Sequence, residues 1–88
     1  MNNARRKEIA KAIAFLQQAD ELLKQAVEIL EFERDGEQEA YDNMPESLQG
    51  SERGEKASEA AQKLDSAVDE LANFDIDTMV GELEAACE

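Results

Sequence analysis

The chain has 88 residues, a net charge of −13 and only four aromatic side chains, none of them tryptophan. This length allows one domain at most. A helical unit this small buries too little apolar surface to offset its ordering entropy comfortably, so a second copy or another protein is the usual remedy. A chain this acidic repels nucleic acid and anionic membranes. We therefore expect a homo-oligomer, in the simplest case a dimer, and a basic partner, with no direct nucleic acid and no membrane.

The charge is unevenly distributed along the chain. Residues 1–24 hold five cations against three carboxylates, so their net charge is +2, whereas residues 25–88 hold a net charge of −15. The five cations are Arg5, Arg6, Lys7, Lys11 and Lys24. The molecule thus has a mildly basic start and a strongly acidic body.

The residues that carry most metal and acid–base chemistry are scarce. There is one cysteine, Cys87, and no histidine, which argues against disulfides and against zinc or redox-metal sites. The carboxylate clusters at residues 35–39 and 75–77 do not follow the calcium-loop pattern. Without histidine the commonest general base is missing. We expect no enzyme activity, no metal and no cofactor. The lack of a disulfide framework fits a reducing compartment, and no apolar run is long enough to cross a bilayer, so we expect a cytoplasmic location.

Residues 3–42 are predicted to form one long helix, capped by Asn2 or Asn3 and weakened at Gly36. Apolar residues recur at spacings of three and four, which is typical of an amphipathic helix. One row is a coiled-coil-like seam of alternating small and large side chains: Ala12, Leu16, Ala19, Leu23, Ala26 and Leu30. A second row, seven residues apart, makes the face wide enough to contact more than one neighbour: Phe15, Leu22 and Ile29.

Residues 43–51 are predicted to form the turn. Pro45 suits the first position of a short helical turn that points Leu48 back to the core. Gly50 then ends this turn, and Ser51 caps the next helix.

A second helix is predicted over about residues 52–87. Its apolar row shifts by about one residue near 73–77. Either the helix continues with a kink near Asp75, which we favour, or Asp75 caps a third, short helix. The sequence therefore predicts an all-α helical hairpin of two long helices in a single domain, 1–88, that dimerises into a four-helix bundle.

Acidic side chains form rows on the second half of the first helix. Glu31, Asp35 and Glu39 are four residues apart, which is about 6 Å along a helix and resembles the spacing of phosphates in a nucleic-acid strand. Such a surface could imitate nucleic acid toward a basic host protein. The alternative is a solvated face that serves solubility alone.

The polar central stretch is a second candidate surface. Gln49, Arg53 and Gly54 are predicted partner contacts, and the alternative is turn chemistry alone. A different hypothesis is a pocket for a small anionic nucleotide, lined by Arg5, Arg6, Lys7, Ser47, Gln49, Ser51 and Arg53.

Three strings resemble a largely uncharacterised family of small acidic helical proteins of bacteriophages, prophages and mobile elements. They are Asn-Ala-Arg-Arg-Lys-Glu-Ile at 3–9, Glu-Gln-Glu-Ala-Tyr-Asp-Asn-Met-Pro-Glu-Ser-Leu-Gln at 37–49 and Ser-Glu-Arg-Gly-Glu at 51–55. The resemblance implies a phage or mobile-element context. Three hypotheses follow for function: an accessory protein that binds and modulates a host protein, such as a counter-defence inhibitor; an oligomer that sequesters a nucleotide; or a self-assembling structural protein.

Overall fold

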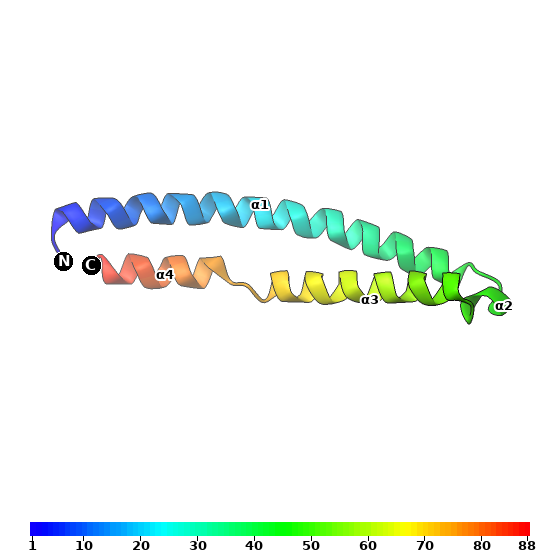
Figure 1. Ribbon diagram of the computed structural model, residues 1–88. Coiled ribbons are helices and arrows are strands. Elements are labelled where there is room, and N and C mark those ends of the chain that lie inside the picture. The colour runs from blue at the N-terminus through cyan, green and yellow to red at the C-terminus, as the bar shows by residue number, and fades with distance from the viewer. The chain divides into compact units, whose positions relative to one another are not determined.

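The computed structural model describes all residues, 1–88, and contains four helices and no strand. α1 covers Asn3–Asp42, α2 Glu46–Gln49, α3 Glu52–Ala72 and α4 Ile76–Ala86 (Figure 1). The predicted all-α fold is confirmed, and α1 has the predicted bounds. The chain divides into two units, unit 1 with Met1–Gln25 and Phe74–Glu88, and unit 2 with Ala26–Asn73.

α1 begins where its sequence offers a cap. The Oδ1 atom of Asn2 accepts a hydrogen bond from the backbone N–H of Arg5 at 2.8 Å, which satisfies one of the free donors at the helix start. The helix passes Gly36 without interruption, because its neighbours Glu37 and Gln38 are good helix formers.

In unit 1, α4 lies alongside the first part of α1 (Figure 1). Ile76 and Val80 of α4 are its buried side chains. Arg6 Nε donates to the backbone oxygen of Cys87 at 2.8 Å, at the end of α4 where carbonyls lack helical partners and the helix dipole is negative. This contact explains a cation in the first turns of α1, where that helix's own dipole disfavours it.

In unit 2, α3 lies alongside the second part of α1 (Figure 1). Ala61 and Val68 of α3 are the buried apolar side chains of this unit. Arg34 of α1 donates from Nη1 to Asp65 Oδ1 of α3 at 3.1 Å. Unit 2 is therefore a helical hairpin, closed by α2 and held by a small apolar core and this ion pair.

The predicted seam lies on the side of α1 that packs within the chain. Five of its six residues are half-buried, namely Leu16, Ala19, Leu23, Ala26 and Leu30, and Ala12 alone is exposed. The larger side chains of Ile13 and Val27 are also half-buried, and they remove more apolar surface from water than alanines do. From Ile9 on, the larger half-buried side chains of α1 are called the inner row below: Ile9, Ile13, Leu16, Asp20 and Leu23 in unit 1, and Val27, Leu30, Arg34, Glu37 and Tyr41 in unit 2.

The favoured single helix over 52–87 is wrong, and the third helix capped by Asp75 is confirmed. Asp75 Oδ1 accepts from the backbone N–H of Thr78 at 3.1 Å, and Oδ2 accepts from the Thr78 hydroxyl at 2.6 Å. The covered positions run from Leu71 in α3 to Ile76 in α4, and five residues of continuous helix rotate a side chain by about 140°. Breaking the helix lets both side chains be covered.

The turn is built largely as predicted. Gly50 ends α2, and Ser51 caps α3 by accepting from the backbone N–H of Gly54 at 3.4 Å. Leu48, however, is 44 % exposed, so the prediction that it points to the core is wrong. The four-residue α2 packs on α3 through its backbone instead, at Gly54, which is buried.

Replacing Gly54 by alanine tests this backbone contact. A Cβ atom there would overlap backbone atoms of Leu48 and Gln49, which cannot swing aside. We expect Gly54→Ala to lower the free energy of unfolding by about 1–3 kcal/mol, measured by urea denaturation.

Gly36→Ala is the matched control, because no atom lies within 4 Å of the added Cβ. It should instead stabilise the chain by about 0.5–1 kcal/mol through better helix propensity. Equal effects at the two glycines would contradict the packing of α2 on α3.

The Asp75 cap predicts a pH effect. Hydrogen bonds from the side chain and then the backbone of Thr78 hold the pKa of Asp75 below its ordinary value. The cap therefore contributes stability above the unfolded pKa and loses it as the pH falls through the lower, folded pKa. We expect Thr78→Val to raise the pKa of Asp75, measured by carboxyl NMR titration. An ordinary pKa in the unmodified chain, or no response to Thr78→Val, would refute the cap.

Candidate partner-binding surface

The second part of α1 carries an acidic surface. Between residues 26 and 51 the single cation is Arg34. All but one of the carboxylates in this stretch are exposed, and Glu37 is half-buried. They are Glu28, Glu31, Glu33, Asp35, Glu37, Glu39, Asp42 and Glu46.

The predicted acidic row is exposed, but its three members are not equivalent. Arg34 Nε pairs with Asp35 Oδ1 at 3.2 Å, which partly neutralises the middle charge. Glu31 and Glu39 have no side-chain partner within the chain. Unpaired charge thus stands at the two ends of the row, two helical turns apart.

Arg34 belongs to the framework rather than to a free surface. Its guanidinium donates to both Asp35 and Asp65. The hydrogen bond to Asp35 raises the pKa of Arg34, and the charge of Asp35 and the contact with Asp65 add to this, while burial opposes it. Arg34, the only cation of the acidic stretch, is therefore already paired with carboxylates of the same chain.

Two of the predicted contacts in the central stretch have local structural roles. Gln49 Nε2 donates to the backbone oxygens of Tyr41 at 3.2 Å and Met44 at 3.3 Å, which satisfies carbonyls at and just beyond the end of α1. Gly54 gives α2 room against α3. These local roles account for Gln49 and Gly54 without a binding partner. That either residue also contacts a partner protein stays a prediction.

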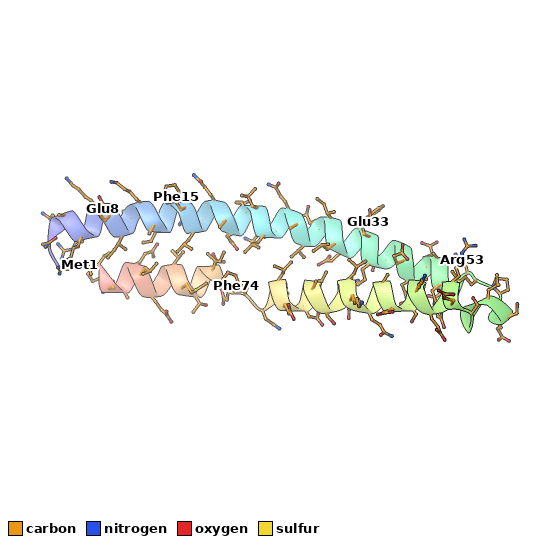
Figure 2. All side chains as sticks on the ribbon, viewed as in Figure 1. Met1, Glu8, Phe15, Glu33, Arg53 and Phe74 are labelled. Carbon is orange, nitrogen blue, oxygen red and sulfur yellow. The ribbon has the colours of Figure 1, made fainter.

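Arg53 is the exception in this stretch. Its side chain is exposed (Figure 2) and takes no part in a hydrogen bond or ion pair. It lines an open hollow of about 520 Å³ with Ser51, Glu52 and Lys56. A hollow this open encloses little of any ligand, since small-molecule sites usually bury most of their ligand.

The residues of the alternative nucleotide pocket fall into both units. Arg5, Arg6 and Lys7 belong to unit 1, and Arg6 is bonded to Cys87. The other members belong to unit 2: Ser47, Gln49, Ser51 and Arg53. The pocket stays a prediction.

The exposed apolar side chains form a further surface on α1. Phe15 is 69 % exposed, and Leu22 and Ile29 are each 64 % exposed. Figure 2 shows Phe15 on the side of α1 that faces away from α4, and Glu33 on the side that faces away from α3. Sequence reasoning placed this row beside the inner one. It did not foresee that the three large side chains of this row lack cover in a single chain.

Comparisons with protein-family models, with curated proteins and with solved structures give no match to this chain. The resemblance to phage and mobile-element proteins therefore stays a prediction. No helix combines the length and hydropathy needed to span a membrane. No cluster of His, Cys, Asp or Glu side chains is arranged to hold a metal ion.

Proposed function

We propose that this chain is a non-enzymatic accessory protein of a phage or mobile element that binds and modulates a basic host protein. The acidic row of Glu31, Asp35 and Glu39 is the binding surface. One observation carries the proposal: Glu31 and Glu39 are exposed and unpaired in a stretch whose only cation, Arg34, is bound within the chain.

The energetics favour a basic partner. Like charges four residues apart repel and weaken a helix slightly, so α1 keeps this row at a cost to its own stability. A groove of Lys and Arg would relieve that repulsion and form charge-assisted hydrogen bonds. Because the row repeats at about 6 Å, a groove that normally follows a phosphate backbone fits it. The chain would then compete with nucleic acid for that groove.

The net charge predicts how such a complex forms. A charge of −13 steers a basic partner to the surface and speeds association, and salt screens this effect. Binding should therefore weaken steeply between low and physiological ionic strength.

A capture experiment with matched variants tests the proposal. The full chain is immobilised, incubated with host lysate at low salt, and washed with duplex DNA. We expect nucleic-acid-binding proteins, identified by mass spectrometry, to be captured and then released by the DNA, because they exchange one polyanion for another. The triple variant Glu31→Gln, Asp35→Asn, Glu39→Gln should lose this capture.

The control removes the same charge elsewhere. Glu82→Gln, Glu84→Gln, Glu88→Gln changes three exposed carboxylates at the C-terminal end of the chain and should keep the capture. Equal capture by both triple variants, or capture that duplex DNA does not reverse, would count against the acidic row as the binding surface.

A further inference from the structure

The side of α1 that carries Phe15, Leu22 and Ile29 has a heptad pattern of its own, in which Ala19 and Ala26 are half-buried and the other members exposed. Small and large residues alternate at spacings of three and four along the helix, which is the repeat of a coiled-coil seam. The large members are mostly exposed, at 64–69 %. We call this row the outer seam: Ala12, Phe15, Ala19, Leu22, Ala26 and Ile29.

A single chain leaves more large apolar side chains exposed than it buries. Its buried core is Ala61, Val68, Ile76 and Val80, while all three phenylalanines are at least 55 % exposed. The accessible surface is 6591 Å², whereas a monomeric protein of 9.8 kDa exposes roughly 5,200 Å². The excess of roughly 1,400 Å² exceeds the ~800 Å² that each partner buries in a standard interface.

We propose that the outer seam binds the outer seam of a second copy of this chain, with the two α1 helices antiparallel. In antiparallel heptad pairing, each alanine position faces a large position of the other helix, and small facing large allows close packing. Ala12 then faces Ile29 of the second copy, and Ala19 faces Leu22 of the second copy. The contact is two-fold symmetric, so every pairing occurs twice.

Charge at the ends of the outer seam offers a test of the direction. Lys11 is paired with Glu8 of its own chain at 2.9 Å, and Glu33 continues the spacing of the outer seam four residues after Ile29. In the antiparallel register that sets Ala12 against Ile29, Glu33 lies opposite Glu8 of the second copy, at the rim of the contact. Parallel helices would instead set Glu33 against Glu33 of the second copy.

The second copy leaves the acidic row free. Glu31 lies about 160° around α1 from Phe15, at 100° per residue. The dimer therefore goes beyond the proposed host-binding function and does not depend on it. If the experiments contradict the dimer at the outer seam, the proposal for the acidic row still stands, and the reverse also holds.

Sedimentation equilibrium of the full chain tests the surface. We expect twice the 9.8 kDa chain mass. Leu22→Glu should weaken the dimer roughly tenfold or more, because it buries a carboxylate opposite Ala19 of the second copy. Gln17→Glu adds the same charge at an exposed position off the seam and should leave the dimer constant within about twofold.

Charge reversal tests the direction and uses only exposed positions that tolerate substitution. Glu33→Lys should strengthen an antiparallel dimer several-fold, because it places an ammonium group opposite Glu8 of the second copy, and adding Glu8→Lys should cancel this gain. A parallel dimer keeps like charges facing at position 33 before and after the change, so it predicts no gain from Glu33→Lys.

Three results would overturn the proposal. They are a monomer at every concentration tested, a dimer that withstands Leu22→Glu as well as Gln17→Glu, and a dimer that Glu33→Lys does not strengthen. Because the charge variants alter surface residues, they decide the question even if Leu22→Glu fails to fold.

Discussion

The structure depends on one constraint: α1 has two apolar faces, and the rest of the chain supplies cover for one. α3 covers the inner row in unit 2, and α4 covers it in unit 1. Their buried side chains are small or medium in size: Ala61, Val68, Ile76 and Val80. The largest apolar side chains of α1, Phe15 and Phe32, remain 69 % and 76 % exposed. The same shortage of cover that limits the stability of one chain also defines where another chain can bind.

One charged residue within the inner row, Arg34, fixes how the helices of unit 2 pair. In unit 1 the half-buried Asp20 is paired within α1 itself, with Lys24 at 3.0 Å, and the hydrogen bond and charge of Asp20 raise the pKa of Lys24. Arg34 is held by Asp65 of α3. An apolar heptad row tolerates a slip of one repeat, whereas a half-buried charge loses its partner when the register slips. Arg34 and Asp65 therefore specify the register of α3 on α1, and surface exposure keeps their contribution to stability small.

Local signals predicted the elements of this fold well. The bounds of α1, the short turn after Pro45 and the cap at Ser51 each follow from a residue and its immediate neighbours. The errors concern tertiary packing. The predicted seam is half-buried except at Ala12, and the second row of Phe15, Leu22 and Ile29, expected to widen it, is left exposed. The break before Asp75 and the roles of Gln49 and Gly54 depend on contacts between segments. The acidic row could be predicted from the sequence. The ion pair between Arg34 and Asp65, which are 31 residues apart, could not.

The most direct test asks whether a second copy covers the exposed apolar side chains of α1, and it uses the three phenylalanines as reporters in one sample. All three are replaced by fluorophenylalanine, and fluorine NMR measures the solvent exposure of each during dilution of the full chain. If a second copy covers the outer seam, Phe15 is shielded from water at high concentration and becomes exposed on dilution. Phe74, 55 % exposed and off α1, keeps one environment throughout. A Phe15 resonance that is equally exposed at every concentration would contradict the account.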